Sequence, residues 1–101
     1  MSEPRIELQD NGHYLLLGEL SFNTVPTIAA NFAKIVNNAD NVVLDLQGVT
    51  RTDSAGLALL IDWMRFAHHK DKHIVFKNMP EQMLAVAKVS ELDHILPLEQ
   101  A

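Results

Sequence analysis

Cysteine is absent from the 101 residues of this chain. No disulfide can form and no metal site can be built from thiolates, which fits a reducing compartment. Lysine and arginine are also scarce, at eight against thirteen acidic residues, and the formal net charge is −5. Because binding to phosphates needs a basic face, this balance argues against a nucleic-acid partner. We therefore expect a cytoplasmic protein that does not bind nucleic acid.

Long hydrophobic runs are missing as well. The longest apolar stretch, residues 55–61, has seven residues, whereas a helix that crosses a bilayer needs about 20. The opening segment MSEPRIELQD lacks the basic region and apolar core of a secretory signal. No direct insertion into a membrane is expected. The chain does have 48% hydrophobic residues, enough for a self-standing core, so residues 1–101 are expected to form a single domain.

Turn signals and apolar periodicity predict alternating strands and helices. Two apolar segments, 6–9 and 14–20, flank Asp10-Asn11-Gly12, which is typical of a β-hairpin. The elements expected after this hairpin are a helix over 25–37, a strand over 42–46, a turn over 48–53, a long helix over 54–70, a strand over 74–77, a helix over 80–90 with Met83, Leu84, Val86 and Ala87 on its buried side, and a short edge strand or turn over 92–98.

The order of these elements is β, β, α, β, α, β, α. Strands that alternate with helices favour right-handed parallel crossovers, and the opening hairpin adds one antiparallel pair. The sequence therefore predicts an α/β fold, a single domain with a mostly parallel sheet, an N-terminal antiparallel hairpin and about three helices.

The stretch VTRTDSAGLALLIDW, residues 49–63, raises the question of a functional site. Thr52, Asp53 and Ser54 are all good N-caps because a side-chain oxygen can accept a bond from a free N–H of the first helical turn, yet one cap would suffice. Gly56 costs a helix roughly 1 kcal/mol relative to alanine. Its usual justification is the close approach of another backbone or of a ligand. From these residues alone, a simple helix cap and a binding site both remain open.

The helix that follows this turn is apolar on two sides. One side is expected against the sheet, and Leu59, Trp63 and Phe66 lie roughly opposite at about 100° per residue. A surface helix needs a narrower apolar stripe. Either a neighbouring helix covers the excess, or the excess is an exposed patch that binds another protein. We expect a partner-binding surface, with Trp63 as its best anchor. Its expected members are Thr52, Asp53, Ser54, Ala55, Gly56, Leu59, Trp63 and Phe66.

Ser54 is also a candidate for phosphorylation. A phosphate there would add about −1.5 to −2 charges at the edge of an apolar patch. The helix dipole would favour that charge, while Asp53 would oppose it. A partner packed over the patch would have to desolvate the phosphate, so the position suits a binding switch.

Catalysis is the competing interpretation of Asp53, Ser54 and the histidines. The sequence has no G-x-S-x-G elbow. His68 and His69 lie at the far end of the helix that Ser54 begins, about 20 Å away at 1.5 Å per residue. No catalytic residue is therefore expected.

Metal and nucleotide sites find equally little support. His69 and His73 have the i, i+4 spacing of helical metal ligands, but the helix is expected to end near Lys70. The chain has neither a P-loop lysine nor a glycine-rich fingerprint. The strand-to-helix turn could hold a phosphate weakly, which is left as a minor alternative. We expect no metal and no cofactor.

Three segments in order resemble the STAS domain family, the fold of bacterial anti-sigma-factor antagonists and related modules. They are GEL at 18–20, VVLDLQGVTRTDSAGLALL at 42–60 and NMPEQMLAVAKVSELDHILPL at 78–98. The first is similar to the end of the family's second strand, the second to its signature of strand, Asp-Ser/Thr turn, glycine and helix, and the third to its closing helix and tail. The resemblance covers nearly the whole chain and implies that Ser54 is the family's key hydroxyl residue.

Within this family, DSAGLALLIDW and NMPEQMLAVAKVSEL look most like a branch of small cytoplasmic subunits of ABC phospholipid transporters in Gram-negative bacteria. That resemblance implies a non-catalytic subunit that binds the ATPase subunit, lies at the inner membrane through the complex, and supports outer-membrane lipid asymmetry. The alternative is an anti-sigma factor antagonist whose partner is a kinase that phosphorylates Ser54. Ser21, where such antagonists commonly carry aspartate, and Ala55, where many carry a second hydroxyl, both weaken this alternative.

Overall fold

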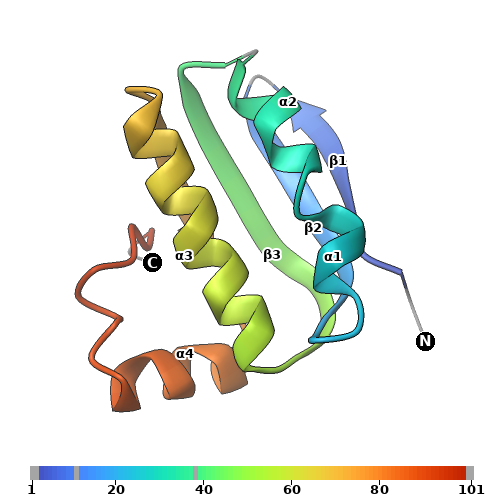
Figure 1. Cartoon of the computed structure of the whole chain (residues 1–101), viewed down its shortest axis with the longest axis vertical. Helices are drawn as coiled ribbons and strands as arrows, with labels where there is room; N and C mark the ends of the chain where they lie inside the picture. Colours follow the sequence, from blue (N-terminus) through green and yellow to red (C-terminus); the bar gives the residue numbers. More distant parts are fainter. Residues whose placement is uncertain (1–2, 11, 38, 100–101) are drawn as a thin grey trace.

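A four-stranded sheet forms the centre of the chain, for which the computed structural model describes residues 3–10, 12–37 and 39–99 (Figure 1). Its strands, in spatial order, are β1 (Arg5–Asp10), β2 (His13–Leu20), β3 (Asn41–Thr52) and β4 (His73–Lys77). β1 is antiparallel to β2, and the β2–β3 and β3–β4 pairs are parallel. The predicted α/β class and hairpin are therefore confirmed, although Asn11 of the predicted turn lies outside the described residues.

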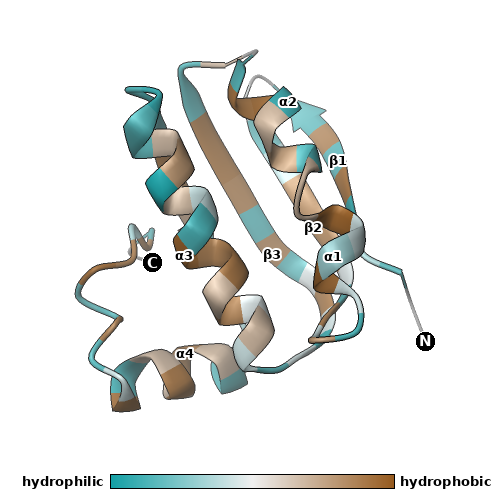
Figure 2. Cartoon of the chain, viewed as in Figure 1, coloured by the Kyte–Doolittle hydropathy of each residue, from teal (hydrophilic) through white to brown (hydrophobic). Residues whose placement is uncertain are grey.

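Three helices, α1 (Val25–Ile28), α2 (Asn31–Asn37) and α3 (Ser54–His69), lie over one face of this sheet, and α4 (Glu81–Val89) crosses its end (Figure 1). Side chains alternate between the two faces of β3, and Val42, Leu44 and Leu46 are fully buried beneath the helices. In Figure 2, hydrophobic residues recur along β3 and along the helices that cover it. In the described part of the chain, no helix has both the length and the apolar character needed to cross a membrane.

The predicted helix over 25–37 is in fact two short helices. The chain turns at Ala29 and Ala30, between α1 and α2. At this break the carbonyl oxygen of Ala29 accepts a hydrogen bond from Trp63 Nε1 at 3.2 Å. The helix is interrupted where its backbone turns to satisfy a buried indole N–H, a contact 34 residues away that no local pattern announces.

The predicted turn over 48–53 is also wrong, because β3 continues to Thr52. Gly48 suggested a turn, but a Cβ there would lie 2.9 Å from the Leu17 side chain on β2. The glycine therefore allows two neighbouring strands to pack closely. Register shifts along the β2–β3 pair let the strand bend without ending, and they bring Leu20 opposite Thr52.

The far side of α3 is covered by α1 and α2. Trp63 stacks on Phe32 with ring centroids 4.8 Å apart, and Phe66 meets Phe32 edge-on at 6.3 Å. Leu59 and Trp63 are each only 3% exposed. The expectation of an uncovered apolar patch is therefore wrong at these two residues. A neighbouring helix pair covers the excess, and Trp63 belongs to the core.

The C-terminal part of the chain closes the molecule over the end of the sheet and along β4. Met83 and Ala87 of α4 are buried as predicted, but Val86 is 40% exposed because it faces outward from this short helix. Beyond α4, the tail pairs with β4 through Phe76, whose N–H donates to Pro97 O at 2.8 Å and whose carbonyl accepts from the Glu99 N–H at 2.9 Å. The expected short edge segment is thus a single bridge.

An exposed ion pair joins two loops at the opposite end of the sheet. Lys72 Nζ lies 2.8 Å from Asp40 Oδ1. The hydrogen bond and the charge of Lys72 lower the pKa of the Asp40 carboxyl below its ordinary value. Because this pKa is lowered on folding, the pair stabilises the fold above the ordinary pKa, and its contribution is lost as the pH falls through the lowered value.

Candidate functional site

The candidate site lies where β3 ends and α3 begins. Asp53 is the N-cap of α3, in an extended conformation, and its Oδ1 accepts a hydrogen bond from the Ala55 N–H at 2.9 Å. Ser54 is the first helical residue and is exposed. The helix-cap interpretation is therefore confirmed for Asp53. Because Asp53 performs the capping, the Ser54 hydroxyl is left on the surface at the positive end of a long helix.

Asp53 also fixes a second segment against this turn. Its Oδ2 accepts a hydrogen bond from the Phe22 N–H at 3.1 Å, and its own N–H donates to Leu20 O at 3.2 Å. One carboxylate thus connects the loop after β2 to the first turn of α3. The connection holds the backbone of Phe22, a residue that is 79% exposed, against Asp53, the residue that precedes Ser54. Sequence reasoning missed Phe22; the available signal was an isolated aromatic residue between polar neighbours directly after a strand.

Replacing Asp53 with alanine is expected to destabilise the protein by about 1–2 kcal/mol. The change removes an N-cap, worth roughly 0.5–2 kcal/mol, and also the bond to the Phe22 N–H. Urea denaturation followed by far-UV circular dichroism measures this loss. Asp53→Asn, which keeps an oxygen that can cap, is the matched control and should lose less. Equal losses in both variants would show that the cap geometry is not what Asp53 contributes.

Gly56 is explained by packing within the chain. It is buried, and a Cβ at this position would lie 2.8 Å from the carbonyl oxygen of Leu20 and would overlap the Thr52 hydroxyl. The close approach inferred from the sequence is therefore an approach of the β2 backbone. It lets the start of α3 sit directly on the end of β2.

The variant Gly56→Ala should consequently lower the free energy of unfolding by about 1–3 kcal/mol, because an extra methyl group in a close-packed place forces the helix away from β2. Chemical denaturation of the purified variant gives the value. Ala58→Ser, at an exposed position two residues later in α3, is the control and should change stability by no more than about 0.5 kcal/mol. A stabilised Gly56→Ala variant would contradict the packing argument.

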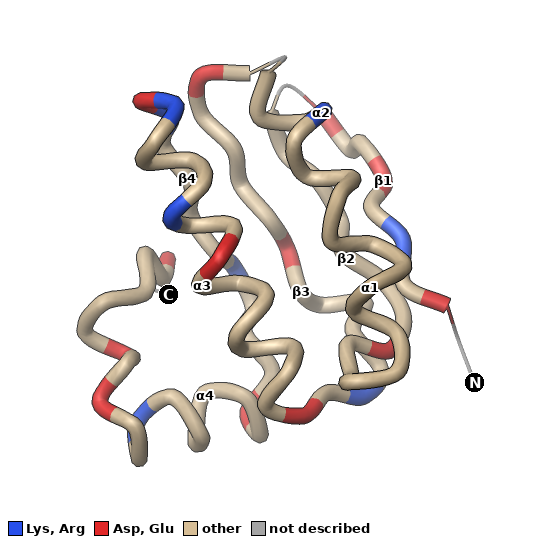
Figure 3. Tube along the Cα trace, viewed as in Figure 1, with Lys and Arg blue, Asp and Glu red and all other residues tan. Residues whose placement is uncertain are grey.

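A polar hollow of ≈ 410 Å³ opens beside this turn. Its floor includes Glu19, which is 9% exposed and whose Oε2 accepts a hydrogen bond from Ser21 Oγ at 2.6 Å. Thr24 holds the same loop through Oγ1, which donates to Glu19 O at 2.6 Å and accepts from the Ser21 N–H at 2.9 Å. Figure 3 shows acidic and basic positions close together around this end of β3. The residues lining the hollow are Glu19, Ser21, Asn23, Arg51, Thr52, Asp53 and Gln82.

The predicted site residues fall into two neighbouring regions of the structure. Residues 52–56 form the turn just described, with Thr52 and Gly56 buried and Asp53 and Ser54 exposed. Leu59, Trp63 and Phe66 instead border a mainly apolar groove of ≈ 320 Å³ between α3 and the α1–α2 pair. The other wall of this groove is lined by Ala29, Ala30, Phe32 and Ala33. The two regions lie along the same helix, but the aromatic residues form a groove wall and do not project as a patch.

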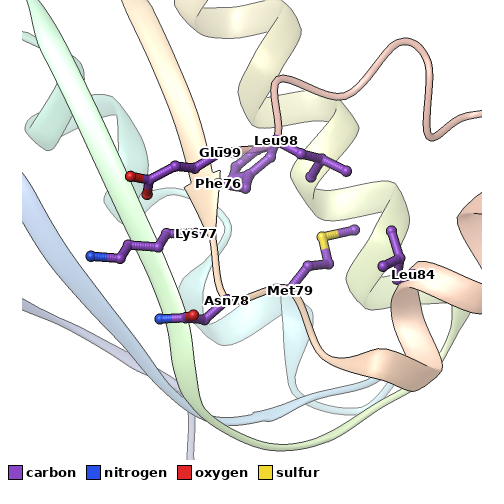
Figure 4. Close-up of a pocket in the computed structure, with 7 residues that line it drawn as sticks. All are labelled: Phe76, Lys77, Asn78, Met79, Leu84, Leu98 and Glu99. Carbon is purple, nitrogen blue, oxygen red and sulfur yellow. The ribbon is translucent and has the colours of Figure 1, made fainter. Parts of the chain in front are cut away.

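Elsewhere the surface offers less chemistry. A hollow of ≈ 290 Å³ lies between the end of β4, α4 and the tail (Figure 4). Leu98, Met79 and Leu84 extend to one side of it, and Lys77 and Glu99 extend to the other (Figure 4). Among residues 3–10, 12–37 and 39–99, no group of three or more His, Cys, Asp or Glu side chains is placed to hold a metal ion.

Family comparison agrees with this architecture. The chain matches the family model described as "Mlab, STAS domain" over residues 7–98, and it therefore belongs to the STAS domain family. It is a MlaB-like member of that family. No curated protein sequence matches the chain.

Solved structures show the same fold at low sequence identity. An anti-sigma factor antagonist from Mycobacterium paratuberculosis has a TM-score of 0.77 at 20% identity, over 100% of this chain and 87% of that one. A STAS domain protein from Planctomyces limnophilus has 0.74 at 17%, over 99% and 92%. The phosphorylated form of the Bacillus cell fate determinant SpoIIAA has 0.68 at 18%, over 96% and 91%. At these identities the likeness establishes the fold of anti-sigma factor antagonists.

Proposed function

We propose that this protein is a non-catalytic binding subunit of an ABC phospholipid transporter that maintains outer-membrane lipid asymmetry. It docks on the cytoplasmic ATPase subunit through residues 52–56 and the beginning of α3, and it supports assembly or activity of the complex. The membership in a family described as Mlab motivates this choice. The structural observation that carries it is the arrangement at the helix start, where Asp53 caps α3 and also holds the backbone of the exposed Phe22, and where Ser54 is exposed.

The surface around Ser54 has the composition of a docking site. A large exposed aromatic such as Phe22 can bury an extensive area on a partner, and aromatic anchors dominate the energetics of many interfaces. The Phe22 backbone is held by Asp53, so part of the ordering cost is met before binding. The apolar groove along α3 extends the same surface. Through this contact the protein would be peripheral to the inner membrane and remain on its cytoplasmic side.

A pull-down of the tagged protein from its own cells in mild detergent, followed by mass spectrometry, tests the proposal. An ABC ATPase together with its membrane permease is the expected result. A Phe22→Ala variant removes an exposed anchor and leaves the core untouched. It should therefore capture less of the ATPase and less of the permease. Recovery of neither transporter component with the wild-type protein would contradict the proposal.

The second candidate function is an anti-sigma factor antagonist controlled by phosphorylation of Ser54. An exposed serine hydroxyl at the first position of α3 favours it, since a kinase can reach that hydroxyl and the helix dipole favours the added charge. The same pull-down distinguishes the two functions, because this one requires a soluble kinase among the captured proteins. It also requires a phosphopeptide that contains Ser54 after incubation with that kinase.

A further inference from the structure

Glu19 is a buried acid without a basic partner in the described part of the chain. It is the one charged side chain among the buried residues there, at 9% exposure. The ion pairs found in these residues join Arg5 to Glu7 and Lys72 to Asp40, and neither involves Glu19. Buried carboxylates are normally paired with a cation or bound to a metal, because hydrogen bonds to neutral groups compensate the lost hydration only in part. Among the residues that the structure describes, the Glu19 carboxylate accepts one side-chain hydrogen bond, from the Ser21 hydroxyl.

The surroundings of Glu19 provide room and further acceptors. The ≈ 410 Å³ hollow above it is many times larger than the roughly 30 Å³ that one water molecule occupies. Asp53 lines the same space, and each of its oxygens can accept more than the single backbone N–H it now receives. The side-chain carbonyl groups of Asn23 and Gln82 add two neutral acceptors. Together these groups suit a planar cation with several N–H donors.

We propose that this hollow receives an arginine side chain of a partner protein, with its guanidinium paired to Glu19 and Asp53. A guanidinium carries five N–H donors in a fixed fork that matches carboxylates, and it is less strongly hydrated than an ammonium group. The hollow shares Thr52 and Asp53 with the proposed docking surface, so a partner bound there also borders the hollow. The source of the arginine rests on the proposed function, whereas the specificity of the hollow for a guanidinium does not.

Arg51 is the competing cation within the chain. It pairs in register with Glu19 across β2 and β3 and lines the hollow, but it is exposed and lies outside ion-pair distance of Glu19 and Asp53. Its charge opposes an incoming guanidinium, and because Arg51 lines the same hollow, salt screens this repulsion less than it screens a repulsion between distant charges. Removing this charge should therefore strengthen binding of a cation in the hollow.

Titration of the isotope-labelled protein with N-acetyl-arginine amide, followed by NMR, tests the proposal without any partner. N-acetyl-citrulline amide is the control ligand, since it has nearly the same shape and no charge. We expect saturable shifts at Ser21, Thr52 and Asp53 with the arginine compound and none with citrulline. Glu19→Gln should weaken binding by about tenfold or more, the loss of a charge-assisted hydrogen bond. Glu7→Gln, on exposed β1, should bind like the wild type.

Equal binding of the citrulline compound would overturn the proposal, and so would unchanged arginine affinity in Glu19→Gln. If Glu19→Gln does not fold, Arg51→Gln decides, because the proposal requires tighter arginine binding in that variant and excludes weaker or equal binding. The pull-down tests the proposed transporter function separately from the arginine-binding hollow. If the pull-down recovers no ATPase while arginine still binds, the hollow stands and the transporter role falls. If the ATPase is captured equally well by Glu19→Gln, the hollow falls and the transporter role stands.

Discussion

The variant Trp63→Ala is expected to lose about 3–5 kcal/mol of stability, the usual cost of truncating a large buried aromatic side chain. Trp63 is 3% exposed, stacks on Phe32 at 4.8 Å and donates from Nε1 to the Ala29 carbonyl oxygen at 3.2 Å. The substitution leaves a cavity between α2 and α3. It also removes the indole N–H that donates to the Ala29 carbonyl oxygen at the break between α1 and α2. For a domain of this size, each kcal/mol lowers the melting temperature by roughly 4–8 °C.

Urea denaturation with fluorescence-independent detection, such as far-UV circular dichroism, measures this loss. Val89→Ala is the control, because Val89 is 87% exposed and its truncation should change stability by no more than about 0.5 kcal/mol. A loss of less than about 1 kcal/mol for Trp63→Ala would mean that the indole is not part of the core. A large loss means that weaker partner binding by this variant reports unfolding, so Phe22→Ala is the proper test of the interface.

Ser54→Glu is expected to weaken binding of the ATPase by more than about tenfold, which corresponds to about 1.4 kcal/mol. A partner that covers the start of α3 would have to desolvate the new carboxylate, and that cost is not returned without a matching cation. The fold should remain intact, since Ser54 is exposed and an acidic side chain at a helix N-terminus is favourable. Biolayer interferometry between the purified protein and the purified ATPase gives the affinities.

Ser54→Gln separates the effect of charge from that of size. The glutamine has nearly the volume of glutamate and no charge, so most of the affinity should return if desolvation of a charge is the cause. Equal losses in the two variants would assign the effect to bulk. Wild-type affinity in Ser54→Glu would remove Ser54 from the interface.

The order of strands and helices could be predicted from the sequence because each element carries its own periodicity and turn signals. The hairpin, the long helix α3 and the parallel strands were expected and are present. The break at Ala29 and the extension of β3 to Thr52 were not. Both depend on contacts between distant segments, one with Trp63 and one between β2 and β3, and such contacts override local signals such as Gly48.

The part of the candidate site that is formed by consecutive residues, 52–56, could be predicted from the sequence. Asp53 as a cap and Gly56 as a close approach follow from their places before and within the first helical turn. Glu19 and Phe22 were missed because the parallel pairing of β2 with β3 brings them to α3 from more than 30 residues away. The apolar excess of α3 was visible in the sequence, but which helix covers it was not.

The most direct test of the central claim is photocrosslinking from position 22 in living cells. Phe22 is replaced by p-benzoylphenylalanine, which keeps an exposed aromatic side chain on the loop that Asp53 holds, and the crosslinked product is identified by mass spectrometry. The proposed function predicts a crosslink to the ATPase of an ABC transporter, and the same substitution at Val89, exposed on α4, should not give it. A crosslink from position 22 to a soluble kinase, or none at all, would contradict the claim that this surface docks on a transporter.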